Sequence, residues 1–291
     1  MTINNLLITA GGIKGIIMLG ILEILYEYNI LKNINNYYGI SVGSIICLLL
    51  ILNYTPNELT NFIINFPTET LLDNNNKLNI LDNLFNNFGI YNINNLKYII
   101  EQLLVFKNIR KNITFIELFK KTNKELTINI SNINKIEYKE YNYKLTPNVK
   151  IIDILLISCS IPIIFKPSKI NNDYYADGGI FGDFPIEYFK NKLDNTLIIT
   201  TNININNNIQ NFNDYFLNLI FGLIKSNTCK DFSKCKYIII IENSMGINFN
   251  ISKKEKIEMT NTGRKLALEF IKQNFYYKFF MKNKDIINIY E

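Results

Sequence analysis

Tyr37-Tyr38-Gly39-Ile40-Ser41-Val42-Gly43-Ser44 is the stretch on which the interpretation of the whole chain depends. It contains the pattern G-x-S-x-G, which is typical of a nucleophile elbow, a sharp strand-to-helix turn with Ser at its apex. The flanks agree with this pattern, because residues 35–38 suit a short strand and residues 42–52 form a nearly unbroken apolar run that suits a helix. The pentapeptide alone is equally consistent with an ordinary glycine–serine turn between a buried strand and a helix.

The complete absence of histidine restricts how Ser41 could be activated. A Ser–His–Asp triad cannot form within this polypeptide, and neither can a zinc site with histidine ligands. If Ser41 is a nucleophile, its general base must be a carboxylate, a lysine or water.

Composition indicates a globular protein with one large domain or two small ones. The 291 residues are 48% hydrophobic and 19% charged, which excludes a disordered chain. The formal net charge of +6 suits weak attraction to an anionic lipid surface or to nucleic acid. Because arginine is rare and no stripe of arginine and aromatic residues is present, we do not expect a nucleic-acid partner.

The start of the chain shows no signal-peptide pattern, because residues 1–5 lack positive charge and glycines soon interrupt the following apolar run. No stretch reaches the roughly 18 apolar residues that a membrane-spanning helix needs. We therefore expect an intracellular protein that is cytoplasmic or peripherally bound to a membrane. Cys47 and Cys159 lie in apolar runs, whereas Cys229 and Cys235 could pair, although reduced thiols are favoured in such a protein.

A glycine turn precedes the elbow. Residues 5–10 predict a buried strand, Gly11-Gly12-Ile13-Lys14-Gly15 follows, and residues 16–28 have helical spacing. Backbone N–H groups at such a helix N-terminus suit an anion. A dinucleotide-binding motif would need glycine at position 10, which is Ala, and an acidic residue closing the second strand. A simple tight turn and an oxyanion hole remain as interpretations.

The rest of the chain predicts an α/β fold, because strands alternate with helices and residues 196–201 and 236–242 are β-branched runs typical of parallel strands. Asp177-Gly178-Gly179 ends a short strand and by itself predicts only a hairpin. Residues 212–224 form a strongly apolar helix, for which core packing is favoured over a lipid-facing lid. Residues 253–284 form a long basic helical region.

Taken in order, these motifs resemble those of the patatin-like phospholipase family from Leu6 to about Ile241. They are specific as a set because all occur in the family's order in a chain without histidine. The matching stretches are the glycine turn, the elbow, Ser158-Cys159-Ser160-Ile161-Pro162, Tyr175-Ala176-Asp177-Gly178-Gly179 and Phe184-Pro185. The chain departs from the family at Ala10, where a glycine is usual, and at Phe184, where a polar residue is common.

The resemblance implies a three-layer α/β/α fold with a mostly parallel central sheet. The helical cap and the C-terminal helix are predicted from the sequence itself, because these two parts match nothing in the family. Residues 1–245 would form the patatin-like acyl hydrolase domain, with the cap-like helical segment at about 55–120. Residues 246–291 would form a basic helical extension packed on that domain. No metal or other cofactor is implied.

The resemblance also implies a Ser–Asp dyad that hydrolyses acyl esters, with Ser41 as the nucleophile and Asp177 as the general base. Asp173 and Asp183 are the neighbouring acids that compete for this second role. The backbone N–H groups of Gly11 and Gly12 match the oxyanion hole. The positions that support the motifs are Lys14, Gly15, Gly39, Gly43, Gly178 and Gly179.

The leading hypothesis is a lipid acyl hydrolase of the phospholipase A type that acts on phospholipid or a related acyl ester at a membrane surface. The apolar helix at 212–224 and the basic C-terminal helix would help it adsorb. One alternative is a soluble carboxylesterase or lysophospholipase with the same dyad. Another is an inactive membrane-binding homologue, against which the intact dyad and glycine turn argue.

Overall fold

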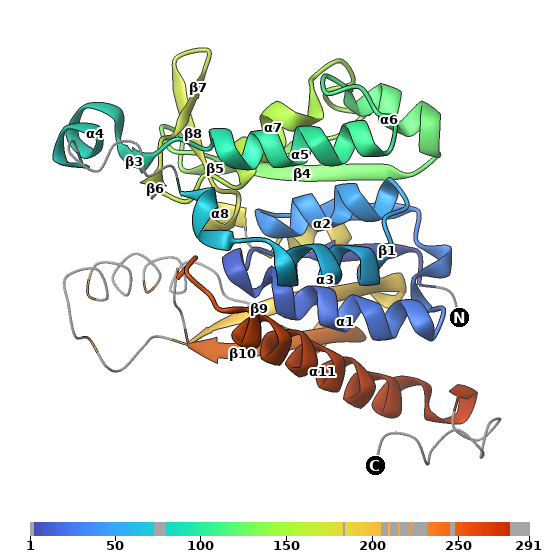
Figure 1. Cartoon of the computed structure of the whole chain (residues 1–291). Coiled ribbons are helices and arrows are strands. Elements are labelled where there is room, and N and C mark those ends of the chain that lie inside the picture. The colour runs from blue at the N-terminus through green and yellow to red at the C-terminus, as the bar shows by residue number, and fades with distance from the viewer. Residues whose placement is uncertain are drawn as a thin grey trace.

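A mostly parallel β-sheet forms the centre of the molecule, and helices pack against it (Figure 1). This computed structural model describes residues 3–72, 80–182, 184–204, 232–244 and 248–279, together with the single residues 209, 215 and 222. Within these residues the sheet has the strand order β10-β9-β1-β2-β4-β8-β7, and β5 pairs with β4. The α/β fold with a mostly parallel central sheet is therefore confirmed.

The strands divide into a parallel part and an antiparallel edge. The parallel part consists of β1 (Asn5–Ile8), β2 (Asn36–Gly39), β4 (Glu125–Asn132), β9 (Thr196–Asn204) and β10 (Tyr237–Ser244). The antiparallel edge consists of β5 (Glu137–Tyr141), β7 (Ser168–Ile170) and β8 (Asp173–Ala176). Two short strands, β3 (Gly89–Tyr91) and β6 (Ile163–Phe165), form a separate parallel pair.

Helices lie in the described connections between parallel strands, which need long crossovers because the strands run in the same direction. The first half of the chain contains α1 (Gly15–Glu27), α2 (Val42–Ile51), α3 (Pro56–Asn65), α4 (Ile80–Asn87), α5 (Asn94–Phe106) and α6 (Phe115–Thr122). The second half contains α7 (Ile151–Ser158), α8 (Gly179–Gly182), α9 (Ile186–Phe189) and α11 (Lys253–Phe279). Short 3₁₀ turns are η1 (Gly12–Lys14), η2 (Ile30–Asn33), η3 (Thr68–Leu71), η5 (Leu193–Asn195) and η6 (Phe232–Lys234).

The first strand shows why the sheet is buried on both faces. Successive side chains of a strand point to opposite faces, so Leu6 and Ile8 enter the main core while Leu7 enters a second, smaller core. The main core is formed with helices such as α1, α2 and α7. The smaller core contains Tyr38 and Phe189, and Phe189 belongs to α9. An unbroken apolar strand is therefore the expected sequence pattern here.

The C-terminal helix α11 lies along α1 (Figure 1). The two backbones approach closely, because a Cβ atom built on Gly263 would lie 2.0 Å from the carbonyl oxygen of Ile17. The Arg264 guanidinium donates to the buried carboxylate of Glu23 at 2.7 Å. Phe270 and Ile271 are buried in the main core. This basic helix thus uses Phe270 and Ile271 for packing, whereas Lys265 and Lys272 are exposed.

Several segments named in the sequence analysis lie outside the described residues. They include Asp183, Cys229, most of the apolar stretch 212–224 and the end of the basic region at 280–291. The predictions made for these segments stay predictions. Cys235 is described and is buried in the smaller core.

Candidate active site

Ser41 lies at the turn between β2 and α2, as the G-x-S-x-G pattern predicts. Its backbone angles are φ 53° and ψ −129°, a conformation that residues with a Cβ atom adopt only under strain. The surrounding hydrogen bonds hold it there. The Ser41 N–H donates to Ser158 Oγ at 3.0 Å, and the Ser41 carbonyl accepts from Ser44 Oγ at 2.6 Å.

The two glycines of the elbow are required by close backbone contacts. A Cβ atom on Gly39 would lie 2.3 Å from Ser44 Cα, and one on Gly43 would lie 2.2 Å from the carbonyl oxygen of Ile8. Both distances are far shorter than van der Waals contact, so any other residue would push α2 away from the sheet. The glycines therefore fix the position of the Ser41 side chain relative to β1 and β2.

Asp177 follows β8 directly and faces Ser41. The Ser41 hydroxyl donates a hydrogen bond of 2.6 Å to Asp177 Oδ2. The other carboxylate oxygen, Oδ1, accepts from the Gly179 N–H at 2.8 Å. Both side chains are buried, with exposed fractions of 4% for Ser41 and 6% for Asp177. The structure thus brings together the two residues that were predicted to form a dyad, 136 positions apart in the sequence.

The segment after α7 supports both partners of this pair. Ser158, the last residue of α7, accepts the N–H of Ser41, and the carbonyl of Ser160 accepts the N–H of Asp177 at 2.9 Å. Sequence reasoning quoted this segment only as a matching motif and gave Ser158 no role. A buried hydroxyl at the C-terminal end of an apolar helix was the available signal, because such a group needs a hydrogen-bond partner.

Two titratable groups nearby have shifted pKa values. Burial, together with the neighbouring negative charge of Asp177, holds the pKa of the Cys159 thiol well above its usual range. Burial lowers the pKa of Lys14, whose side chain is 7% exposed. The Cys159 thiol is therefore neutral, and the role of Lys14 stays a prediction.

The glycine turn lies beside the elbow. Gly12 has φ +53°, the left-handed region that favours glycine, and it begins η1, which leads into α1. A Cβ atom on Gly11 would lie 2.6 Å from the terminal methyl group of Met18. In the described part of the chain, the N–H groups of Gly11 and Gly12 donate to no protein acceptor. They lie at the N-terminus of a helical segment, where the backbone dipoles favour negative charge.

An apolar cavity of about 170 Å³ borders Ser41 and Gly12. The first turns of α1 and α2 form one side, and helices α3 and α5 form the other. Apolar side chains from these four helices that line the cavity are Ile16, Val42, Ile45, Leu49, Leu59, Phe62, Ile63, Ile99, Ile100 and Leu103. A cavity with this lining suits an apolar ligand.

The segment before α11 also contributes to this cavity. Phe249 lines it and packs against Phe165 with a ring separation of 6.4 Å. The carbonyl of Phe249 accepts a hydrogen bond of 2.6 Å from the buried Thr68 hydroxyl. In addition, Lys253 donates to Asn65 Oδ1 at 2.8 Å, at the end of α3. The C-terminal part of the chain is thereby attached to the cap-like segment and to the wall of the cavity.

Two kinds of feature are absent from the described residues. Among them, no three Asp, Glu or Cys side chains are grouped so that they could hold a metal ion. None of the described helices combines the length and the apolar character that crossing a membrane requires.

These features define a candidate serine hydrolase site of the Ser–Asp kind. A buried serine hydroxyl donates to a carboxylate, and it lies at a strand-to-helix elbow beside an apolar cavity. The model of the patatin-like phospholipase family matches residues 6–190 of this sequence. The chain therefore belongs to the patatin-like phospholipase family, which confirms the resemblance found in the sequence.

Relatives and solved structures agree with this assignment. The chain is 34% identical over 285 residues to the probable lipid hydrolase 463L of Invertebrate iridescent virus 6, covering 93% of this chain and 90% of the relative. It is 26% identical over 253 residues to triacylglycerol lipase 5 of Saccharomyces cerevisiae, covering 77% of this chain and 31% of that protein. The crystal structure of VipD from Legionella pneumophila shares the fold, with a TM-score of 0.64, 16% identity and coverage of 94% of this chain and 67% of VipD.

The strained backbone of Ser41 makes a prediction about stability. Replacing Ser41 with Gly or with Ala removes the hydroxyl in both cases, but only Gly also removes the Cβ atom that opposes φ 53°. We expect Ser41→Gly to be more stable than Ser41→Ala by about 1–2 kcal/mol. Denaturant unfolding of the two variants measures this difference directly. An Ala variant as stable as the Gly variant would show that the elbow is unstrained.

Proposed function

We propose that this protein is a lipid acyl hydrolase that cleaves carboxylic esters through a Ser41–Asp177 dyad. The observation that carries the proposal is the buried hydrogen bond of 2.6 Å from Ser41 Oγ to Asp177 Oδ2, beside an apolar cavity. Membership of the patatin-like phospholipase family supports the same reaction class. Two of the relatives are named as a probable lipid hydrolase and a triacylglycerol lipase, which supports a lipid ester as the substrate.

The proposed reaction begins with proton transfer inside the dyad. As Ser41 Oγ attacks the ester carbonyl carbon, Asp177 Oδ2 takes the hydroxyl proton and then delivers it to the leaving alkoxide. An acyl group is then attached to Ser41. Asp177 next removes a proton from a water molecule, which attacks the acyl carbonyl and releases the fatty acid with regeneration of the serine hydroxyl.

A carboxylate is a weak base, so stabilisation of the oxyanion must supply much of the rate enhancement. The N–H groups of Gly11 and Gly12 are the candidate donors, because within the described residues they bind no other acceptor and they lie at the start of a helical segment. Ser41 and Gly12 line the same cavity, which brings this turn to the nucleophile. One donor of this kind typically contributes about 10²–10³ in rate.

The lining of the cavity favours a substrate with a hydrocarbon chain. Because α2 starts directly after Ser41, residue Leu49 lies roughly 11 Å further along the helix axis from Val42. An acyl chain bound along α2 would replace water against Ile45, Ile46 and Leu49. We therefore propose a phospholipid of the kind cleaved by phospholipase A, or a neutral acylglycerol, in preference to a small soluble ester. The buried, hydrogen-bonded dyad argues against an inactive homologue.

The dyad makes a prediction that separates Asp177 from its neighbour. Asp177→Asn keeps the shape of the side chain but removes the base, so kcat/KM on a soluble ester should fall by at least about 10³-fold, and Ser41→Ala should act alike. Asp173→Asn is the matched control, because Asp173 instead pairs with Lys135 at 3.2 Å. It should stay active. Loss of activity in Asp173→Asn, with activity retained in Asp177→Asn, would show that the base had been misassigned.

The pH profile extends the same prediction. The base acts only when ionised, so kcat/KM should fall as the pH drops through the pKa of the carboxyl group. The chain has no histidine, so no imidazole titrates near neutral pH. We therefore expect kcat/KM to stay constant in that range. A step near pH 6.5 in the wild-type profile, unchanged in Asp173→Asn, would contradict the proposed base.

The cavity makes a prediction about chain length. Leu49→Phe fills part of the cavity, so it should lower kcat/KM for a long-chain ester by about tenfold or more, while a short-chain ester loses little. Val105→Phe adds comparable bulk at an exposed position of α5 and should change neither value. Equal losses on long and short esters in Leu49→Phe would show that the acyl chain binds elsewhere.

A further inference from the structure

The short helix α4 presents its apolar side chains to solvent. Leu81 and Phe85 are 70% and 73% exposed, and Phe88, directly after the helix, is 52% exposed. Leu81 and Phe85, four positions apart, lie on one face of the helix, and Phe88 is exposed at the turn that follows it. We call Leu81, Phe85 and Phe88 the α4 tip. A helix that simply packs on a soluble protein turns such a face inward.

Asn83, on the other side of α4, faces inward. Asn83 is buried, with an exposed fraction of 6%, and its side-chain oxygen accepts from Lys166 Nζ at 3.0 Å. Asn87 Nδ2 donates to the same oxygen at 3.1 Å. These bonds fix the rotation of the helix about its axis, so the outward direction of Leu81 and Phe85 is a property of the fold.

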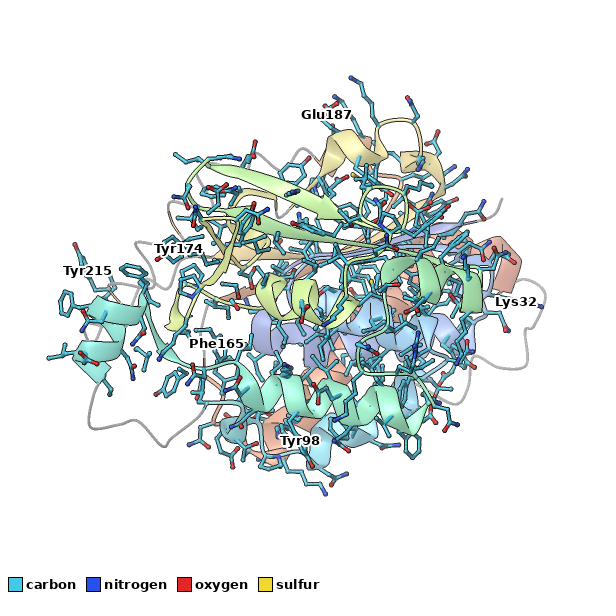
Figure 2. The ribbon with its side chains drawn as sticks, turned by 90° about the horizontal axis from the view of Figure 1, so that it is seen from above. Lys32, Tyr98, Phe165, Tyr174, Glu187 and Tyr215 are labelled. Atoms are coloured by element: carbon cyan, nitrogen blue, oxygen red, sulfur yellow. The ribbon has the colours of Figure 1, made fainter. Side chains whose placement is uncertain are left out.

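The α4 tip is connected directly to the wall of the catalytic cavity. Strand β3 begins at Gly89, immediately after Phe88, and pairs with β6 in the register Gly89–Ile163 and Tyr91–Phe165. Phe165 lines the cavity that borders Ser41. Phe88 also packs edge-to-face on Tyr174, with a ring separation of 5.5 Å. Figure 1 shows α4 projecting from the body, and Figure 2 shows the labelled Tyr174 on the same side of the molecule.

We infer that the α4 tip is a lipid-docking surface, by which the protein inserts Leu81, Phe85 and Phe88 into the acyl boundary of a membrane or lipid droplet beside the catalytic cavity. Insertion there would place ester groups at the surface close to the cavity wall at Phe165. The role of this docking in ester hydrolysis rests on the proposed function, but binding to lipid does not require catalysis.

Lipid fits this surface better than a protein partner does. The two phenylalanines of the tip expose on the order of 250 Å² together. A specific protein interface buries roughly 800 Å² on each partner, several times more. Insertion into lipid needs no matching partner surface, and its strength scales with the apolar area buried. The exposed Lys169, whose Nζ lies 5.4 Å from the centre of the Tyr174 ring, adds a positive charge suited to an anionic headgroup.

The test compares two double variants in the inactive Ser41→Ala background, so that the lipid stays intact. Leu81→Asn with Phe85→Asn removes the tip. Leu145→Asn with Phe106→Asn is the matched control, because these side chains are 61% and 75% exposed on other elements. Sedimentation with vesicles of phosphatidylcholine and phosphatidylglycerol should show a partition coefficient about tenfold or more lower for the tip variant. The control should stay within about twofold of its parent.

Three results would overturn the inference. Undiminished vesicle binding of the tip variant would show that α4 does not dock. An equal fall in the partition coefficient of both double variants would show that any exposed apolar residue contributes, whatever its position. A light-scattering mass that shows a dimer, converted to a monomer by the tip variant, would show that a second copy covers the surface instead. Kinetics on a soluble short-chain ester keep the two proposals apart. With Ser41 restored, the tip variant should match the wild type, whereas a wild type inactive on every ester would refute only the proposed function.

Discussion

The buried contact between Ser41 Oγ and Asp177 Oδ2 is the interaction on which the site depends, and strand β4 makes it possible. β5 occupies one side of β4, and β2 and β8 share the other side, with Gly39 opposite Ile128 and Ala176 opposite Ser131. Because β2 runs parallel and β8 antiparallel to β4, the two strands approach each other end to end, and the residues that follow them meet beside β4. The end of α7 then fixes both of them through Ser158 and Ser160, so three segments distant in the sequence determine a distance of 2.6 Å.

This arrangement has costs that the surrounding structure must offset. A carboxylate with an exposed fraction of 6% is unfavourable unless hydrogen bonds satisfy it, and Asp177 obtains them from a hydroxyl and from the Gly179 N–H. The elbow adds backbone strain at Ser41. Dense packing around β1, α1 and α2 supplies the compensating stability, and α11 extends it through the close contact at Gly263. The site is consequently rigid at the dyad and apolar in the cavity beyond it. The proposed ester cleavage needs both properties, because it takes place in an environment poor in water.

The parts of the fold and site that depend on local chemistry could be predicted from the sequence. Close backbone contacts leave room only for glycine at positions 39 and 43, and the chain must turn tightly between β1 and α1. These motifs therefore predict the local backbone structure. The absence of histidine excluded a Ser–His–Asp triad and left a carboxylate, a lysine or water as the base, and the family resemblance then pointed to Asp177. Features that depend on tertiary contacts could not be predicted. Nothing in the sequence of α4 shows that Asn83 faces inward and Phe85 outward, since periodicity gives the amphipathic face but not the direction it points. In the same way, the sequence predicted a basic C-terminal helix packed on the domain, but it did not show that Phe270 and Ile271 would be the residues in the core.

The central claim is that Ser41 is an activated nucleophile, and covalent labelling tests it most directly. A fluorophosphonate forms a stable bond with a serine only when a nearby base and an oxyanion site assist the attack. After reaction of the whole protein, digestion and mass spectrometry identify the modified residue. The account predicts one phosphonate group, on the peptide that contains Ser41, formed much more slowly in an Asp177→Asn protein. Labelling of a different serine, or equal labelling rates with and without the Asp177 carboxylate, would contradict it.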